Sequence, residues 1–307
     1  MRGRLAAALA VASCLVFAAC GGGGGHERER AVVALDFTPN AVHAPIYAAG
    51  GLEIRAPGSA PDALKLVASG RADIGVLDIH DLGLAAERGA DVVGIGALVQ
   101  RPLAAIIARG DVRRPRDLEG RRVGVSGLPS DVAVLRAVLA GDGADVAEVD
   151  QVTIGFAAVP NLVQRKIDAV PAFWNAEGVT LRRRGVRIRE FRVEEFGAPP
   201  YPEVVLFTTR RTLERRRGAV EEALSAIRAG IESALADRAA ASAEIARVSG
   251  ADVALVRAQL DAVAPALRPP LRLDRAVLER WAAFDERFGI LSRRPDVDRL
   301  FEFGLAP

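Results

Sequence analysis

The stretch AVVALDFTPNAVHAPIYAA, residues 31–49, contains the pattern that decides the fold. It reads as the apolar run of a buried strand, then a turn around Pro39, then a helix. Five polar or aromatic residues gather here, in a chain with only three histidines and two tyrosines: Asp36, Phe37, Asn40, His43 and Tyr47. A structural turn needs one or two polar caps, so this larger set predicts the wall of a binding pocket.

The alternation of strands and helices continues beyond this segment. The next strand-like runs are LEIRAP (52–57), ADIGVLD (72–78) and DVVGIGALV (91–99), with helical spacing between them in PDALKLVASG and DLGLAAERG. A second series comprises AAIIARG, RRVGVSG, VDQVTIG, KIDAVPAF and GVRIREF, and EVVLFTTR (203–210) adds one more strand. Mainly helical segments follow, such as GAVEEALSAIRAGIESAL and DRAVLERWAAFDERFG. This order predicts an α/β fold with mostly parallel sheets.

Two arrangements fit this order: two independent domains in series, or a bilobed protein whose chain crosses into a second lobe and returns. We predict the bilobed arrangement, because strand-like runs lie near 104 and 203, where two crossings would be needed. Lobe 1 then comprises residues 31–104 and 207–307, and lobe 2 comprises residues 105–206. Ligands bind between such lobes, outside the carboxyl ends of strands, so LDFTPN, VLDIH, GVSGLPS and AFWNAEG are expected to face the cleft.

Residues 1–19 have the features of a secretory signal peptide. Two arginines precede an apolar run, Leu5 to Ala19, that is too short for a comfortable membrane span. FAAC, ending at Cys20, resembles the bacterial lipobox, whose cysteine is acylated and becomes the mature N-terminus; the alternative is an ordinary signal peptide with a chance cysteine. Residues 20–30 are expected to form a flexible, glycine-rich tether. The protein is therefore predicted to be extracytoplasmic and lipid-anchored to the cell membrane.

The composition is that of an ordinary soluble globular protein. Of its 307 residues, 50% are hydrophobic and 26% are charged, and the formal net charge of +2 does not suggest nucleic-acid binding. Loss of Cys14 with the signal leaves Cys20 as the only cysteine, so no disulfide, zinc site or thiol nucleophile is expected. The acidic stretch DGADVAEVD lacks the spacing of a calcium loop. We predict no metal and no cofactor.

Several motifs together resemble a known family. LDFTPNAVHAPIYAA, LVASGRADIGV, DLEGRRVGVSG, DAVPAFWNAEG and WAAFDERFGILSRRPDVDRLF resemble the NMT1/THI5-like type II periplasmic substrate-binding proteins, over roughly residues 31–303. The resemblance implies a bilobed type II periplasmic-binding-protein fold. It also implies a receptor that delivers a small heteroaromatic ligand, such as a pyrimidine precursor of thiamine, to the permease and ATPase subunits of an ABC importer. Phe37 stands where the family usually has tryptophan, and the segment after Tyr47 is shorter.

A planar aminopyrimidine needs flat surfaces for stacking and hydrogen-bond acceptors around its edge. Trp174 and Asn175 follow a predicted strand directly, so Trp174 is expected to stack and Asn175 to read a ring edge, with core packing as the alternative for Trp174. Glu177 would accept from an amine, or else lie in the first turn of a helix where acids are favoured.

The segment quoted first supplies the opposite wall. Asp36 would accept from the ligand or cap the turn, and Phe37 would stack on the ring or pack in the core. His43 would contact the ligand or be a satisfied structural histidine. Tyr47 lies four residues later on the same helix face, with its hydroxyl directed to the cleft.

Weaker candidates lie at the other strand ends. Asp78 and His80 follow ADIGVLDI and are expected near the cleft. Ser126 and Ser130 lie where a glycine-containing turn enters a helix, whose free N–H groups bind polar groups; helix capping is the alternative for Ser130. Tyr201 lies beside a predicted crossing and would close over the ligand.

Other functions compete with the pyrimidine receptor. A receptor for riboflavin, another flavin-like ring or an alkylsulfonate would keep the fold and change the cargo. The eukaryotic enzymes that make the thiamine pyrimidine share the family's fold, and VHAPIYAA resembles their histidine-bearing segment. Those enzymes carry a cysteine-rich iron-associated motif, for which the mature chain has no cysteines, so we predict that this protein is not an enzyme.

Overall fold

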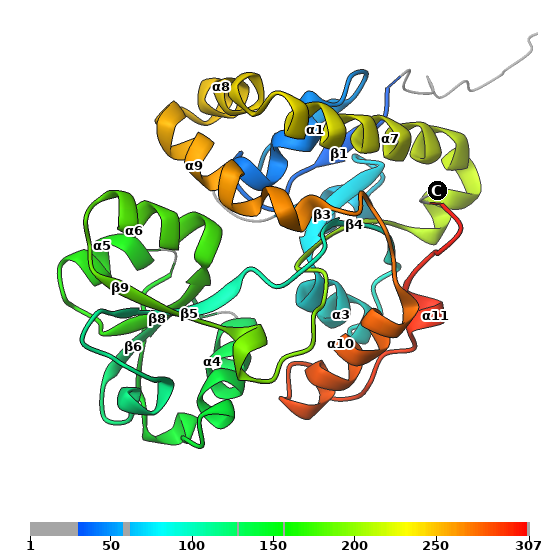
Figure 1. The fold of residues 1–307 in the computed structure, drawn as a ribbon. Coiled ribbons are helices and arrows are strands. Elements are labelled where there is room, and N and C mark those ends of the chain that lie inside the picture. Colours follow the sequence, from blue (N-terminus) through cyan, green and yellow to red (C-terminus); the bar gives the residue numbers. More distant parts are fainter. Residues whose placement is uncertain (1–29, 58–61, 128, 156, 306–307) are drawn as a thin grey trace, which may run out of the picture.

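The computed structural model describes residues 30–57, 62–127, 129–155 and 157–305. The predicted signal peptide, Cys20 and all of the tether except Arg30 lie outside these residues. Figure 1 shows two α/β lobes, the first built from both ends of the described chain and the second from its middle.

The first lobe contains a five-stranded sheet in the order β2-β1-β3-β10-β4. Its strands are β1 (Val32–Ala34), β2 (Glu53–Arg55), β3 (Ile74–Asp78), β4 (Val93–Val99) and β10 (Val204–Thr208). Strand β1 pairs in parallel with β2 and β3, whereas β10 runs antiparallel to β3 and β4. Strands β1, β4 and β10 are buried along their whole length, as expected of a sheet covered on both faces.

Helices cover both faces of this sheet, with α1 and α7 on one side and α3 and α10 on the other (Figure 1). The helices are α1 (Ala44–Ala48), α2 (Ala63–Ala68), α3 (Ile79–Glu87), α7 (Arg210–Ala236), α8 (Arg238–Ser249), α9 (Val253–Val263), α10 (Arg275–Arg287) and α11 (Val297–Leu300). Asp237, Asp252 and Asp274 cap α8, α9 and α10 through backbone N–H groups. Within the described residues, none of the helices combines the length and the apolar character that crossing a bilayer requires.

The second lobe contains a sheet in the order β7-β6-β8-β5-β9. Its strands are β5 (Ala104–Arg109), β6 (Arg122–Val125), β7 (Asp150–Thr153), β8 (Ala169–Phe173) and β9 (Ile188–Arg192), and its helices are α4 (Pro129–Gly141), α5 (Ala158–Val163) and α6 (Val179–Arg183). A π-helical turn, η4 (Trp174–Gly178), joins β8 to α6. The short 3-10 turns of both lobes are η1 (Ala41–His43), η2 (Pro115–Leu118), η3 (Val146–Glu148), η5 (Val193–Phe196) and η6 (Ala264–Leu267).

The predicted strand-like runs all form strands, and in each sheet four of the five run in the same direction, with β10 and β5 as the antiparallel exceptions. In the second lobe β6 pairs in parallel with β7 and β8, while β5 is antiparallel to β8 and β9. The antiparallel strands β5 and β10 are the first strands after the two crossings. A chain that arrives from the other lobe is not bound by the crossover connection that keeps neighbouring strands parallel. The predicted lobe limits at residues 104 and 207 stay a prediction, and β10 begins at Val204.

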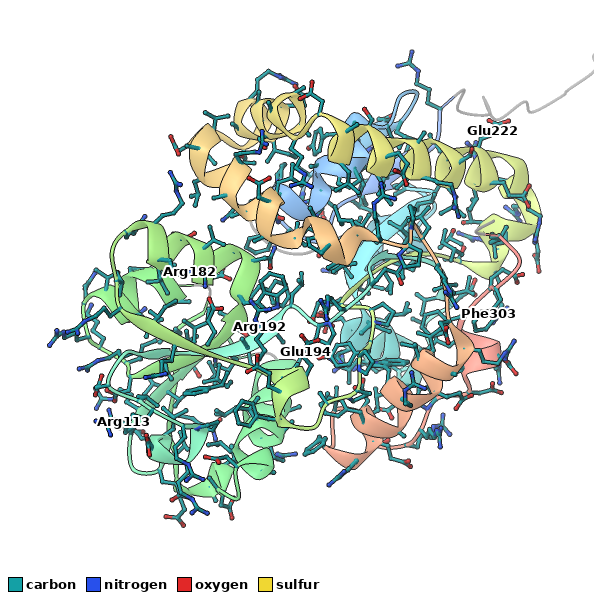
Figure 2. All side chains as sticks on the ribbon, viewed as in Figure 1. Arg113, Arg182, Arg192, Glu194, Glu222 and Phe303 are labelled. Atoms are coloured by element: carbon teal, nitrogen blue, oxygen red, sulfur yellow. The ribbon has the colours of Figure 1, made fainter. Side chains whose placement is uncertain are left out.

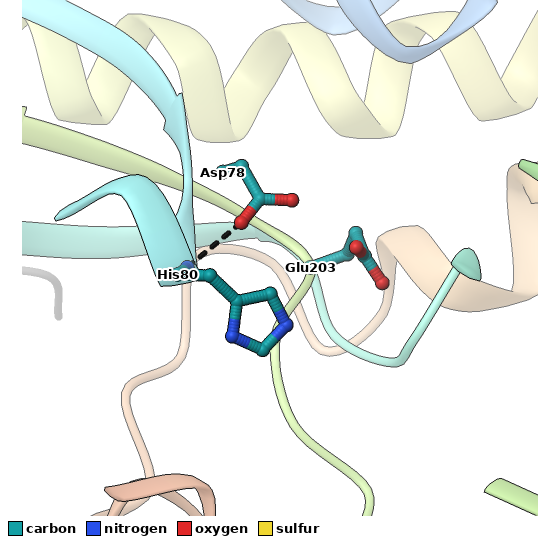
Figure 3. A group of neighbouring side chains, drawn as sticks. All are labelled: Asp78, His80 and Glu203. Atoms are coloured by element: carbon teal, nitrogen blue, oxygen red, sulfur yellow. Dashed lines mark hydrogen bonds between the residues drawn. The ribbon is translucent and has the colours of Figure 1, made fainter. Parts of the chain in front are cut away.

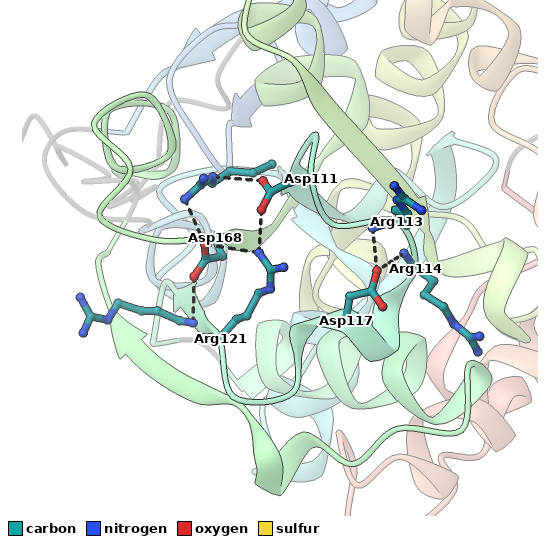
Figure 4. Close-up of polar contacts among 8 residues, drawn as sticks. Asp111, Arg113, Arg114, Asp117, Arg121 and Asp168 are labelled. Atoms are coloured by element: carbon teal, nitrogen blue, oxygen red, sulfur yellow. Dashed lines mark hydrogen bonds and ion pairs between the residues drawn. The ribbon is translucent and has the colours of Figure 1, made fainter.

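The outer end of the second lobe carries shared ion pairs between arginines and aspartates (Figure 4). Arg109 Nη1 lies 3.1 Å from Asp168 Oδ1, and Arg121 Nη1 lies 2.8 Å from Asp111 Oδ2. Asp117 accepts backbone N–H groups of Arg113 and Arg114 nearby. Half-buried and exposed pairs near the surface contribute little to stability, about 0–1 kcal/mol each. They leave the arginine-rich surface locally balanced in charge.

Candidate functional site

The first strand ends in a hydrogen-bonded Asp36–His43 pair. His43 Nε2 lies 2.8 Å from Asp36 Oδ1, and His43 Nδ1 accepts the backbone N–H of Asn40 at 3.2 Å. Because Nδ1 is an acceptor, Nε2 carries the proton and donates to Asp36. His43 is only 1% exposed, so it holds the half-buried Asp36 carboxylate in place. Asn40 caps η1 by accepting the Val42 N–H at 2.9 Å.

Phe37 and Tyr47, predicted to join this wall, lie in different surroundings. Phe37 is 45% exposed, so a flat apolar ring remains open to solvent next to Asp36. Tyr47 is half-buried, and burial together with Glu244 raises the pKa of its hydroxyl. Glu244 belongs to α8, so the Tyr47 hydroxyl lies toward that helix, and the structure does not bring it together with Asp36.

Asp78 ends β3, the strand next to β1, so Asp36 and Asp78 follow the carboxyl ends of neighbouring parallel strands. Asp78 Oδ1 accepts the backbone N–H of His80 at 2.7 Å and thereby caps α3. Burial and the nearby Asp78 raise the pKa of Asp81 to about 7, and Asp36 contributes to the same rise. These three carboxyl groups therefore lie close enough to repel one another.

His80 lies beneath this strand end and contacts α10. Its Nδ1 lies 2.8 and 2.9 Å from the two carboxylate oxygens of Asp285, and both side chains are buried. Burial opposes a charge on His80, but Asp285 and Asp78 outweigh it and raise the pKa of His80 to about 10. Trp281 is fully buried, and its indole nitrogen lies 3.3 Å from His80 Nδ1.

Tyr201 lies in the segment just before β10 that returns the chain to the first lobe, here called the returning crossing, and it packs against His80. The two rings meet edge to face with centroids 5.0 Å apart, and Tyr201 is 0% exposed. Its hydroxyl has no hydrogen-bond partner among the described residues. The predicted role of Tyr201 as a cover over a ligand stays a prediction, since here its ring is part of the packing under α3 and α10.

The second lobe contributes carboxylates from two strand ends. Ser126, after β6, donates its backbone N–H to Asp131 Oδ2 at 2.6 Å, while the neighbouring Ser130 is half-buried in the first turn of α4. Burial raises the pKa of Asp131, and Asp78 of the first lobe raises it further. Glu177, in η4, accepts the backbone N–H of Phe173 at 3.1 Å, and burial and Asp131 raise its pKa. We call Asp36, Asp78, Asp131 and Glu177 the interlobe carboxylates.

Trp174 and Asn175 lie deeper than the predicted stacking wall. Trp174 is 6% exposed, and its indole N–H donates to the Pro102 carbonyl oxygen at 3.1 Å. The Arg192 guanidinium lies 4.2 Å from its ring centroid, and Figure 2 places Arg192 on the side of the second lobe that faces the first. Asn175 is 1% exposed, and its Oδ1 has no partner among the described residues. Trp174 thus packs against the segment between β4 and β5 that leads into the second lobe, here called the outgoing crossing. Its predicted stacking role stays a prediction.

Sequence reasoning missed Glu203 and Asp285. Glu203 is 1% exposed, and its Oε2 accepts the backbone N–H groups of Leu103 and Ala104 at 2.5 and 3.2 Å. Burial and Asp78 raise the pKa of Glu203 to about 8. An acid at the start of the otherwise apolar run EVVLF was the available signal for Glu203. For Asp285 the signal was an acid four residues after Trp281 on a buried helix face.

Two surface cavities lie away from the interlobe carboxylates. One, of about 640 Å³, is lined by the end of α3 and by several arginines, including Arg210, Arg293 and Arg299. The other, of about 630 Å³, lies beside β7 and includes Arg122 and Lys166. Neither includes any of the predicted ligand-binding residues.

Comparison with known proteins identifies a family model and a relative with sequence similarity to this chain. The family described as NMT1/THI5 like matches residues 41–241. The "Formylaminopyrimidine-binding protein" of Halalkalibacterium halodurans is 30% identical over 199 residues, which is 61% of this chain and 60% of that protein. The match therefore spans less than two thirds of the relative's length.

Solved structures share the fold at lower sequence identity. The alkanesulfonate-binding protein SsuA from Xanthomonas axonopodis pv. citri, bound to MOPS, has a TM-score of 0.69 at 18% identity and covers 89% of this chain and 98% of its own. The desulfurization enzyme DSZB has a TM-score of 0.63 at 17% identity, covering 90% and 98%. These likenesses confirm the predicted bilobed periplasmic-binding-protein fold, which binding proteins and an enzyme share. Because the family match spans more than half of its length, the chain belongs to the NMT1/THI5-like family.

Proposed function

We propose that this protein is an extracytoplasmic binding protein for a pyrimidine precursor of thiamine, with an aminopyrimidine of the formylaminopyrimidine type as its ligand. The observation that carries the proposal is the group of interlobe carboxylates, to which each lobe contributes two. Asp36 and Asp78 follow β1 and β3, and Asp131 and Glu177 follow β6 and β8. Burial is the main cause of the raised pKa of Asp131, and Asp78 adds a smaller contribution from across the lobes.

Carboxylates match the donors of such a ligand. The exocyclic amine of an aminopyrimidine offers N–H donors, and hydrogen bonds from them to ionised acceptors are the strong kind, worth about 1.5–3 kcal/mol each. The exposed Phe37 ring beside Asp36 offers an apolar surface for stacking, which adds about 0.5–1.5 kcal/mol beyond burial. The similarity to a formylaminopyrimidine-binding protein supports the same ligand class.

The same carboxylates argue against an alkylsulfonate. A sulfonate is a permanent anion, and placing it among four carboxyl groups would add like-charge repulsion. Riboflavin is neutral and remains the alternative cargo. Transport then requires that ligand binding favour a closed arrangement of the lobes, which an ABC permease and its ATPase subunits would recognise. Acylation of Cys20 would hold the protein at the membrane, and catalysis is no part of the proposal.

Calorimetric titration of the purified protein with four compounds tests the proposal. These are formylaminopyrimidine, hydroxymethylpyrimidine, riboflavin and an alkanesulfonate. Saturable binding of a pyrimidine, with the sulfonate silent, is the expected result. Sulfonate binding without pyrimidine binding would overturn the ligand assignment, and riboflavin binding alone would change the cargo while keeping the receptor. Fatty-acid labelling and detergent partition of the full chain and of a Cys20→Ser variant test the anchor.

A further inference from the structure

Three side chains converge at the end of β3, next to the other interlobe carboxylates. Asp78, His80 and Glu203, here called the His80 cluster, each offer one ligand atom, and these atoms lie within 4.8 Å of one another (Figure 3). Asp78 and His80 come from the junction of β3 and α3, and Glu203 comes from the crossing just before β10. Among the described residues, this is the only group of three histidine, cysteine or acidic side chains so arranged.

His80 presents a buried nitrogen with no partner. Asp285 engages Nδ1 through both carboxylate oxygens, while Nε2 has no hydrogen-bond partner among the described residues, in a side chain that is 1% exposed. A carboxylate on one ring nitrogen is the usual arrangement behind a metal-binding histidine, because it fixes the ring and raises the basicity of the other nitrogen. A buried polar atom without a partner is uncommon and calls for an explanation.

Both carboxylates of the cluster are held by backbone amides through one oxygen. Asp78 Oδ1 accepts the N–H of His80, and Glu203 Oε2 accepts two N–H groups of the outgoing crossing. Each carboxylate therefore has a fixed position and a second oxygen left for another partner. One nitrogen and two oxygens, preorganised in this way, form a ligand set suited to zinc and other first-row divalent ions.

The charges around the cluster favour a cation. Asp78, Asp81, Glu203 and Asp285 surround the single imidazole of His80, which supplies at most one positive charge. Buried acids are costly unless paired, and a divalent ion bound among them would offset more charge than the one imidazolium does.

We propose that Asp78, His80 and Glu203 bind a divalent transition-metal ion, with Asp285 as the residue that orients His80. Tetrahedral ligands about 2.1 Å from a zinc ion lie roughly 3.4 Å apart, so metal binding draws the three ligand atoms in from their present span. Three protein ligands leave a further coordination position for water or a solute. The sequence-based expectation of no metal site relied on the absence of cysteines. The sequence alone does not show that Glu203 lies beside Asp78 at the end of β3.

Zinc titration of the full chain, stripped of metal with a chelator, tests the proposal. We expect one equivalent of zinc to bind, with a rise in the melting temperature and one zinc per chain by elemental analysis. Asp78→Asn keeps the helix cap, and Glu203→Gln keeps an acceptor for the backbone amides, so both variants are designed to fold. Each is expected to weaken zinc binding at least about tenfold, because one of three ligands becomes a poor donor.

Asp81→Asn is the matched control, since it makes the same carboxyl-to-amide change at the start of the same helix without removing a ligand. Its zinc affinity is expected to stay within about threefold of wild type. The absence of stoichiometric zinc binding by the wild-type chain overturns the proposal. So does an equal loss in Asp81→Asn and Asp78→Asn, because that result indicates general electrostatic attraction. Pyrimidine titration in the presence of the chelator is a separate readout, so failure of the metal site leaves the proposed ligand untouched.

Discussion

Glu203 Oε2, in the returning crossing, accepts the backbone N–H of Leu103 in the outgoing crossing at a distance of 2.5 Å. One buried carboxylate thus ties together the two segments that connect the lobes, and it does so beside Asp78. Because opening and closing of a bilobed protein takes place about such segments, Glu203 links the connection between the lobes to the charges of the candidate site.

The stability of the metal-free protein is expected to fall as the pH rises. The pKa of Glu203 is about 8 in the folded chain, above its ordinary value of 4.5, so its contribution is complete below pH 4.5 and is lost as the pH rises toward 8. The pKa of His80, about 10, gives a loss of the same sign between pH 6.5 and 10. Glu203→Gln should reduce the slope between pH 5 and 8 by up to about 1.4 kcal/mol per pH unit. Urea unfolding with a chelator present, at several pH values, measures both slopes. An unchanged slope in the variant would show that Glu203 does not titrate in this window.

Removal of the Asp131 charge is expected to weaken pyrimidine binding. Asp131→Asn keeps an oxygen that accepts the Ser126 N–H and loses only the ionised acceptor, so a loss of about 10-fold to 100-fold in affinity is expected. Asp145→Asn is the control, because Asp145 also caps a turn of the second lobe, at the exposed η3. Calorimetric titration of both variants with the pyrimidine measures the two affinities. Equal affinities of Asp131→Asn and Asp145→Asn would show that Asp131 does not contact the ligand.

The contact between α7 and α1 depends on a glycine. A Cβ at Gly230 would overlap the carbonyl oxygen of Pro45 in α1, whereas a Cβ at Gly218 in the same helix would meet nothing within 4 Å. Gly230→Ala should therefore destabilise the fold by about 1–3 kcal/mol through overpacking. Gly218→Ala should stabilise it by up to about 1 kcal/mol, because alanine favours the helix. Denaturant unfolding of the two variants is the measurement, and a shared sign would contradict the argument.

Hydrogen bonds join the two lobes away from the crossings at two places. Gln259 of α9 donates to the Ala176 carbonyl oxygen and to Thr180 Oγ1, each at 3.4 Å, and Arg136 makes the second link. Arg136 of α4 donates to the carbonyl oxygen of Phe288, just after α10, at 2.6 Å. Arg136→Ala should shift the ligand-free protein toward a more open arrangement, by roughly twofold to fivefold in the ratio of the two forms.

Small-angle scattering detects this shift as a larger radius of gyration. Arg114→Ala provides the control, because Arg114 pairs with Asp142 inside the second lobe. An identical radius for Arg136→Ala and wild type would indicate that this bond does not bias the lobes.

The positions of the strands along the sequence were predictable, because each strand is a compact apolar run between turn residues. The direction of β5 and β10 was not, since it depends on pairing with strands distant in sequence. At the candidate site, Asp36 and Asp78 were predictable as the polar residues directly after strands. The His80–Asp285 pair was not, because its members lie 205 positions apart, and the position of Asp285 on the Trp281 face of α10 does not show which residue it meets.

The position of β10 has a consequence for the order in which the molecule forms. β10 lies between β3 and β4, so β4 gains its sheet partner only after the chain has been synthesised as far as Thr208. The strands of the second sheet, by contrast, all lie between Ala104 and Arg192 and form a contiguous block. On a nascent chain the second lobe can therefore complete its sheet first, while β4 waits with an unpaired edge. A chain released before β10 would expose that edge, so truncation ahead of residue 204 should yield a folded second lobe attached to an aggregation-prone first one.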